Sequence, residues 1–176
     1  MKTDSLSSHA QPRLQNPQAS PAAWAGMMAL QQVVNRNGLD PLLLDLVKLR
    51  VSQLNRCAYC IDLHVRDALQ RGETAERLHL LPAWEEVDCY SARERAALRW
   101  AESLTRLADG PVTDAVYGEA RAHFSEAELL DLTLAIVAIN GWNRFNVGFR
   151  VPPQATGYFK VSARPAHPAS ETVAAT

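Results

Sequence analysis

Cysteine is scarce in this chain: it has three among 176 residues, and two of them, Cys57 and Cys60, lie close together. Long apolar runs are also lacking, because the most apolar segment, Leu129 to Ile139, is interrupted by Asp131 and is too short to span a bilayer. The first residues carry no apolar segment of the kind found in secretory signals. These absences predict a cytoplasmic protein. Thiols are kept reduced in that compartment, so a close cysteine pair is more often catalytic or metal-binding than a permanent structural disulfide.

An excess of either charge is absent as well. Lysine and arginine number 18 and aspartate and glutamate 19, for a formal net charge of −1. Nucleic-acid binding and polybasic membrane anchoring both need clustered positive charge, so neither is expected. The chain has no phosphate-cradling glycine loop, so we expect no nucleotide cofactor. The apolar fraction of 47% suits one globular domain with a sizeable core.

Helix signals are dense, and no stretch shows the sustained alternation of a strand. Asp40 and Pro41 are typical of a helix start, and Gly72 is typical of a helix end. Capping boxes begin at Ser91 and Ser125. The sequence therefore predicts an all-α fold, a compact bundle of six to eight helices. The expected helices cover residues 22–37 (ending at Gly38), 41–54, 57–71, 91–108, 113–123 and 125–145, with Trp84 and Cys89 in a loop.

The two ends of the chain differ in composition from this region. Residues 1–20 are rich in serine, glutamine, proline and asparagine, and residues 162–176 are small and polar. Such segments predict a flexible N-terminal arm and a flexible tail around a single domain at residues 21–161. His9 and His167 lie in these ends and are therefore poor candidates for catalysis.

The segment CAYCIDLH, residues 57–64, concentrates the chemically reactive side chains. On a helix, Cys57 and Cys60 have Cα atoms about 5 Å apart, which suits a disulfide. His64 lies about 6 Å from Cys60 and roughly 10.5 Å from Cys57 in the same geometry. Because helical side chains lean towards the N-terminus, His64 is better placed to exchange protons with Cys60. Unpaired amides at a helix start also favour the thiolate, which is the nucleophilic form.

Three interpretations of this cluster remain open on spacing alone. A redox dithiol needs two cysteines at disulfide distance and a proton acceptor, and both are present. A structural zinc site needs four ligands, and the remaining cysteine, Cys89, stands alone. Haem attachment needs a histidine directly after the second cysteine, where this chain has Ile61. The third interpretation is two inert buried thiols beside a core histidine.

The preceding segment, LLLDLVKL, contains a carboxylate in an apolar context, where it needs a partner. If residues 41–54 and 57–71 form an antiparallel hairpin turning near Asn55, Asp45 and His64 lie at similar distances from the turn. Asp45 then either bonds His64 and raises its basicity, or pairs with Lys48 on an exposed helix face. The sequence alone leaves both arrangements open.

These residues form a known pattern. The segment DLVKLRVSQLNRCAYCIDLH resembles the core motif of the carboxymuconolactone decarboxylase superfamily, in its alkyl hydroperoxidase D-like branch. That motif has an acidic residue, eleven spacers, a CxxC pair and a histidine four residues later. The segment AINGWNRFNVGFRVPP, with Asn140, Trp142, Asn143 and Arg144, is similar to the family's second recognisable stretch. The likeness extends over roughly residues 22–155.

The resemblance implies a thiol-dependent peroxidase that assembles as homotrimers or homohexamers. Cys60 would attack the peroxide, Cys57 would resolve the product, and His64 and Asp45 would form a proton relay. A hydroperoxide would be the substrate, and a thiol or a redox protein the reductant. Two positions depart from the family pattern: Asp45 stands where glutamate is usual, and Tyr59 where some of these peroxidases carry histidine.

Two other functions compete with the peroxidase. One is a lactone decarboxylase, a lyase that does not need the cysteine pair. The other is a helical oligomer without enzymatic activity, whose dithiol senses redox state or only packs.

Overall fold

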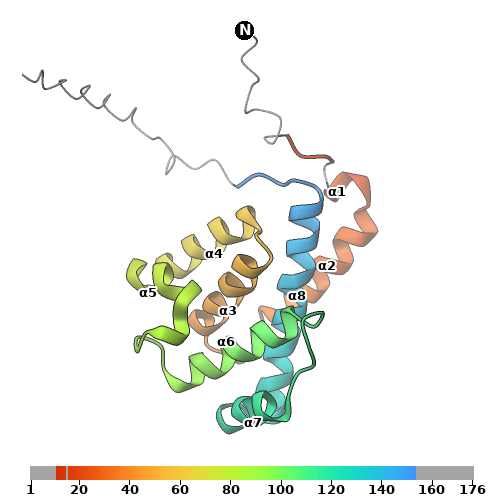
Figure 1. The fold of residues 1–176 in the computed structure, drawn as a ribbon. Coiled ribbons are helices and arrows are strands. Elements are labelled where there is room, and N and C mark those ends of the chain that lie inside the picture. Colours follow the sequence, from red (N-terminus) through yellow and green to blue (C-terminus); the bar gives the residue numbers. More distant parts are fainter. Residues whose placement is uncertain (1–10, 15, 154–176) are drawn as a thin grey trace, which may run out of the picture.

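The computed structural model describes residues 11–14 and 16–153, and the long helix α8 (Glu126–Gly148) runs through its middle (Figure 1). No strand occurs in these two ranges, so the predicted all-α class is confirmed. None of the helices in this part of the chain is long and apolar enough to cross a membrane. The predicted tail, the first ten residues of the predicted arm, His9 and His167 lie outside the described residues.

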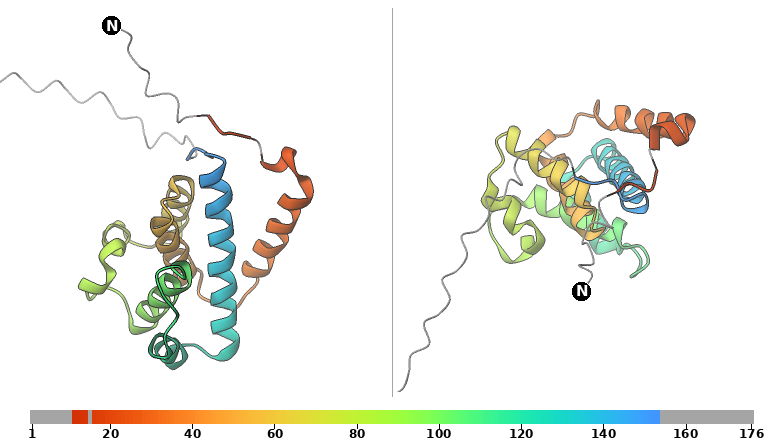
Figure 2. Two further views of the ribbon diagram at one scale, coloured as in Figure 1. Left: turned by 45° about the vertical axis from the view of Figure 1, so that its right-hand side comes forward. Right: turned by 90° about the horizontal axis from the view of Figure 1, so that it is seen from above.

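Helix α8 packs between two layers, with α2 on one side and α3 on the other (Figure 2). Helix α4 forms a hairpin with α3, α6 packs against α3 and α8, and α7 packs against α6. A short α5 and a 3₁₀ helix connect α4 to α6. The remaining bounds are α1 (Asn16–Ala19), α2 (Pro21–Val34), α3 (Pro41–Leu54), α4 (Ala58–Gln70), α5 (Ala75–Leu80), the 3₁₀ helix (Leu81–Glu86), α6 (Ala92–Thr105) and α7 (Asp114–His123).

The predicted helix signals are found at their expected positions. The side chain of Asp40 caps α3, and the capping boxes at Ser91 and Ser125 form with both of their hydrogen bonds. Gly72 ends α4 with a φ of +96°, in the left-handed region that favours glycine. Local capping chemistry therefore fixes the start of α3 and the end of α4, and so the hairpin that carries CAYCIDLH.

Three helix ends differ from the prediction. Helix α2 ends at Val34, before residue 37, and Gly38 has no positive φ and does not act as a left-handed cap. Helix α6 ends at Thr105 before residue 108, and the exposed Leu107 offers no packing to extend it. Helix α8 continues to Gly148, three residues beyond the predicted end, and Asn146 in this extension is buried.

The segment around Trp84 is helical, although a loop was expected there. Trp84 is buried in a cluster with Leu46 and Leu81, and its Nε1 donates a hydrogen bond to Glu102 at 2.8 Å. Burial of this indole orders the 3₁₀ helix, since a large apolar group gains most from leaving water. Cys89 lies just beyond it and is exposed.

Helix α3 is the most enclosed element, because α4, α6 and α8 all pack against it. Leu46, Val47, Leu49 and Val51 have no exposed surface. The apolar context of Asp45 in the sequence therefore marks a helix at the centre of the fold. This burial forces Asp45 to find a partner inside the protein.

Candidate active site

The cysteine pair stands at the start of α4. Cys57 and Cys60 form a disulfide with Cα atoms 5.4 Å apart, so the predicted proximity is confirmed. Cys57 is the N-cap residue, and its Sγ accepts a hydrogen bond from the backbone N of Cys60 at 3.4 Å. Both sulfurs thus lie at a helix N-terminus, where backbone amides favour a thiolate once the pair is reduced.

A cavity of about 800 Å³ lies among α2, α3, α4 and α8. Cys60 lines this cavity together with His64 and Tyr59, whereas Cys57 does not. Both cysteines are almost fully buried, so the difference lies in their position relative to the cavity. A small molecule that enters the cavity can reach Cys60 without displacing Cys57.

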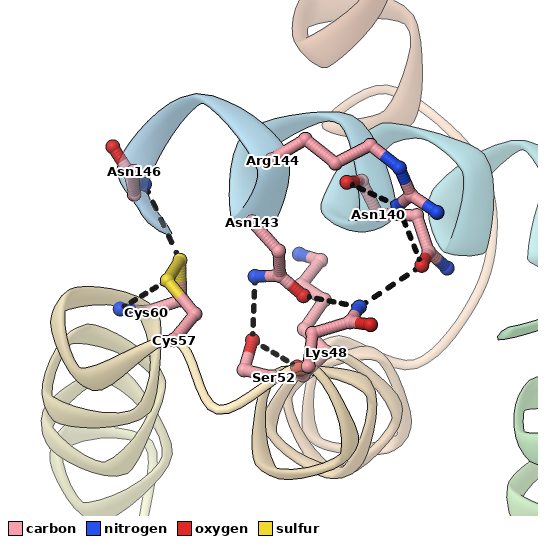
Figure 3. Close-up of a disulfide and its surroundings, with 9 residues drawn as sticks. Lys48, Ser52, Cys57, Cys60, Asn140, Asn143, Arg144 and Asn146 are labelled. Atoms are coloured by element: carbon pink, nitrogen blue, oxygen red, sulfur yellow. Dashed lines mark hydrogen bonds between the residues drawn. A yellow bond between two sulfur atoms is a disulfide. The ribbon is translucent and has the colours of Figure 1, made fainter. Parts of the chain in front are cut away.

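Asn146 of α8 contacts the cysteine that faces the cavity. Its Nδ2 donates a hydrogen bond to Sγ of Cys60 at 3.3 Å (Figure 3). A donor at this position stabilises a thiolate more than a neutral thiol. Asn146 was not among the predicted site residues. The three-residue spacing of Asn140, Asn143 and Asn146, which places them near one face of a helix, was the available signal.

The other two asparagines join α8 to the turn between α3 and α4 (Figure 3). Nδ2 of Asn55 donates to Oδ1 of Asn140 at 3.0 Å and to Oδ1 of Asn143 at 2.9 Å. Nδ2 of Asn143 donates in turn to Oγ of Ser52 at 3.1 Å. These bonds hold α8 against the turn, and they thereby position its last turn over the cysteine pair.

The other two residues of the family's second stretch have different surroundings. Trp142 lines the cavity, and its Nε1 donates to Oε1 of Gln31 at 3.0 Å. Arg144 is exposed and bonds the carbonyl and side chain of Asn140. Only the tryptophan of these two therefore shapes the site.

His64 is buried one helical turn after Cys60. Its Nδ1 has no hydrogen-bond partner among the described residues. Burial lowers the pKa of His64 to about 3, and the positive charges of Lys48 and Arg71 contribute. The imidazole is therefore neutral at physiological pH and can accept a proton. A thiolate at Cys60 would favour the protonated form, because an opposite charge nearby stabilises it.

Asp45 is buried as well, and its partner is neither of the two predicted ones. Its Oδ2 accepts a hydrogen bond from Nη1 of Arg71 at 2.6 Å. Burial raises the pKa of Asp45, although Arg71 and Lys48 oppose this shift. Asp45 thus hydrogen-bonds neither His64 nor Lys48, the two alternatives that the sequence leaves open, and forms an ion pair with Arg71, which caps the end of α4.

Asp45 and His64 are nevertheless close. An oxygen of Asp45, a nitrogen of His64 and an oxygen of Asp67 lie within 4.8 Å of one another. One water molecule can bridge such a distance, so the relay role of Asp45 stays a prediction. The same three atoms could hold a cation, but Asp45 already forms an ion pair with Arg71. The positive charge of Lys48 also interacts with both carboxylates, those of Asp45 and Asp67. The two basic side chains therefore leave little charge for a metal ion to neutralise.

We expect His64 to make the protein less stable as the pH falls from about 6.5 towards 3. Its pKa is lower in the folded state, so the unfolded state takes up the proton first, and the free energy of unfolding decreases over this window. Replacing His64 by glutamine should flatten the profile. Urea unfolding at a series of pH values measures the effect.

The exposed His79 supplies the control position, since His79→Gln makes the same substitution without changing the core. Asp45, whose pKa is raised, remains in every variant and cancels in the comparison to first order. Parallel profiles for wild type and His64→Gln would contradict the assignment.

Residues 21–103 match the carboxymuconolactone decarboxylase family. The chain is also 39% identical over 128 residues to the uncharacterized protein YdfG of Bacillus subtilis, a stretch that covers 73% of this chain and 87% of that protein. The chain therefore belongs to the carboxymuconolactone decarboxylase family.

Two solved structures share the fold. A protein of unknown function from Agrobacterium tumefaciens, described as a candidate antioxidant defence protein AhpD, is 38% identical with a TM-score of 0.81, over 83% of this chain and 100% of that one. A peroxidase-related protein from Ralstonia eutropha, described as an alkylhydroperoxidase AhpD core, has a TM-score of 0.70 at 17% identity, over 80% of this chain and 75% of that one. The 17% likeness shows the shared fold, and the likeness to the Agrobacterium protein places the chain in the alkyl hydroperoxidase D-like branch.

Proposed function

We propose that this protein is a thiol-dependent peroxidase that reduces hydroperoxides through the Cys57–Cys60 pair. One observation carries the proposal: of the two paired cysteines only Cys60 lines the cavity, and it does so beside a neutral histidine and an amide donor. The likeness to the Agrobacterium protein, described as a candidate antioxidant defence protein, supports it.

In the first step the Cys60 thiolate attacks the terminal oxygen of the hydroperoxide. A sulfur–oxygen bond forms and the oxygen–oxygen bond breaks, so that Cys60 becomes a sulfenic acid and an alkoxide leaves. Asn146 stabilises the thiolate before the attack. His64 takes the thiol proton and returns it to the leaving alkoxide, which departs as an alcohol.

In the second step the Cys57 thiol attacks the sulfur of the Cys60 sulfenic acid. The Cys57–Cys60 disulfide forms and water leaves, which is the oxidised state that the structure contains. Two electrons from an external thiol or a redox protein then reduce the disulfide. Asp45 assists as a positioning residue, because an oxygen of its carboxylate lies within 4.8 Å of a nitrogen of His64 and Arg71 holds that carboxylate in place.

The alternative functions receive less support. A lactone decarboxylase does not use the cysteine pair, so the placement of Cys60 on the cavity favours a peroxidase.

The predicted homotrimer or homohexamer stays a prediction. Exposed apolar side chains at Val33, Leu130 and Val137 are compatible with such an assembly.

A stoichiometric titration tests the proposed function. One equivalent of tert-butyl hydroperoxide should remove two thiols from the reduced protein and yield one equivalent of alcohol. The Cys89→Ser variant should behave identically, because Cys89 is exposed and does not line the cavity. The proposal fails if the two thiols of the folded, reduced protein do not react.

A further inference from the structure

Lys48 of α3 is a charged residue of the cavity that the proposed mechanism does not use. Its side chain is half-buried and lines the cavity together with Cys60 and His64. Asp45 takes its ion pair from Arg71, and in the part of the chain that the structure describes the Lys48 ammonium forms neither an ion pair nor a hydrogen bond. A cation that is partly withdrawn from water in this way is stabilised when a negative charge forms beside it.

The register of the α3–α4 hairpin places Lys48 relative to the cysteine pair. A short turn centred on Arg56 joins the two helices, so residues equally far from Arg56 lie at the same level. Asp45 and Asp67 stand eleven residues to either side of it, and their carboxylate oxygens lie within 4.8 Å of each other, which agrees with this register. Lys48 and His64 stand eight residues to either side and are therefore level as well.

The charges along the cavity follow in order from this register. Lys48 is level with the residue one turn after Cys60, about 6 Å from it along the helix axis. Asp45 and Asp67 follow at about 10.5 Å, and Arg71, bonded to Asp45, at about 16 Å. The first charge that a thiolate at Cys60 meets along the cavity is therefore positive.

No charge from the other walls of the cavity competes with this one. The exposed Arg56 and Arg144 do not line it, and the described residues of α2 and α8 that do are not ionisable. Besides Cys60, the ionisable side chains on the cavity come from α3 and α4 and are Asp45, Lys48, Tyr59, His64, Asp67 and Arg71.

The imidazole one turn from Cys60 already responds to Lys48. Burial lowers the pKa of His64 to about 3, and the charge of Lys48 adds more to this shift than the charge of Arg71 does. Burial also lowers the pKa of Lys48 itself, while Asp45 opposes that shift. A thiolate at Cys60 would favour the ammonium form in the same way, because opposite charges stabilise each other.

Resting on the assignment of Cys60 as the attacking cysteine in the proposed function, we propose that Lys48 supplies the positive charge that stabilises the Cys60 thiolate. The ammonium keeps its proton throughout and forms no covalent bond. During the attack, negative charge moves from sulfur to the leaving oxygen, and a fixed cation in the same cavity stabilises that charge too. Lys48 thus provides the charge, whereas His64 carries the proton.

Titration of a protein whose only thiol is Cys60 tests this role. In the Cys57→Ser, Cys89→Ser double variant, Lys48→Met should lower the ionisation constant of Cys60 about three- to thirtyfold, the effect of one unit charge at about 10 Å in a partly buried site. Thiolate absorbance as a function of pH measures this constant. Lys48→Arg restores the charge and should stay within about threefold of the parent. Equal titration of the parent and Lys48→Met, or equal losses with methionine and arginine, overturns the proposal.

Replacing His64 by glutamine in both proteins distinguishes direct from indirect action. An imidazolium could otherwise take over the charge of the missing ammonium. In this background Lys48→Met should lower the ionisation constant by at least the same factor. Loss of the effect would show that Lys48 acts only through His64, and it would overturn direct stabilisation of the thiolate.

Two further substitutions check the sign and the location of the charge. Asp67→Asn removes a negative charge from the cavity and should raise the ionisation constant, by a smaller factor because Asp67 is farther from Cys60. Arg56→Met removes an exposed cation that does not line the cavity, and the change should be less than about threefold, because water and salt screen exposed charges. A decrease with Asp67→Asn, or a loss with Arg56→Met equal to that with Lys48→Met, would contradict the assignment.

The titration uses no peroxide, so it separates the two proposals. If reduced wild type consumes no tert-butyl hydroperoxide while the ionisation of Cys60 depends on Lys48, the peroxidase function fails and the role of Lys48 stands. If the peroxide is consumed while Lys48→Met titrates like its parent, the role of Lys48 fails and the peroxidase function stands.

Discussion

Serine in place of Cys60 is expected to lower hydroperoxide turnover by roughly a thousandfold or more, because a hydroxyl is a far weaker nucleophile than a thiolate. Cys57→Ser should have a different effect. It leaves the first attack intact and blocks the resolving step, so one equivalent of peroxide reacts rapidly and turnover then stalls. Stopped-flow kinetics over one turnover, followed by a steady-state assay, separates the two variants.

The structure predicts this asymmetry from the surroundings of the two sulfurs. Cys60 lines the cavity and its Sγ accepts a hydrogen bond from Asn146, whereas Cys57 caps α4 and does not line the cavity. Cys89→Ser serves as the control and should retain wild-type kinetics. Rapid consumption of peroxide by Cys60→Ser would reverse the assignment of attacking and resolving cysteines.

Leucine in place of Asn146 is expected to lower the rate of peroxide attack about ten- to a hundredfold at neutral pH. The leucine side chain is similar in size but donates no hydrogen bond, and a bond to a charged group contributes about 1.5–3 kcal/mol. The fraction of Cys60 present as thiolate should fall accordingly. Thiolate absorbance of the reduced Cys57→Ser protein, followed as a function of pH, measures that fraction.

A high-pH measurement distinguishes this effect from misfolding. At a pH where the Cys60 thiol is fully ionised in both proteins, Asn146→Leu should react nearly as fast as wild type, because both then contain the same fraction of thiolate. Arg144→Leu on the same helix is the control, since Arg144 is exposed and does not line the cavity. A loss of rate that persists unchanged at high pH would assign Asn146 a structural role instead.

Local chemistry made part of the fold predictable. Asp40, Ser91 and Ser125 cap their helices through neighbours within a few residues, and such signals are legible in the sequence. The spacing of Cys57 and Cys60 fixed their proximity for the same reason, since a helix sets the distance. The order around Trp84 was missed because it depends on a buried contact with Glu102, which is distant in the sequence.

The unpredicted parts of the site are contacts between distant segments. Asn146 meets Cys60 across 86 residues, and no local pattern around either residue specifies the pair. Arg71 reaches Asp45 because the α3–α4 hairpin brings its two ends together. The hairpin was predicted. Whether Asp45 bonds Arg71 or His64, however, depends on the length and orientation of these side chains, which the register of the hairpin does not determine.

The most direct test of the central claim is to map the sulfenic acid. Reduced Cys57→Ser protein is exposed to tert-butyl hydroperoxide in the presence of dimedone, which traps sulfenic acids, and the adduct is located by mass spectrometry. The mechanism predicts one adduct, on Cys60, whose formation matches the rate of peroxide loss. Peroxide loss without a Cys60 adduct, or an adduct on Cys57 in the matched Cys60→Ser protein, would contradict it.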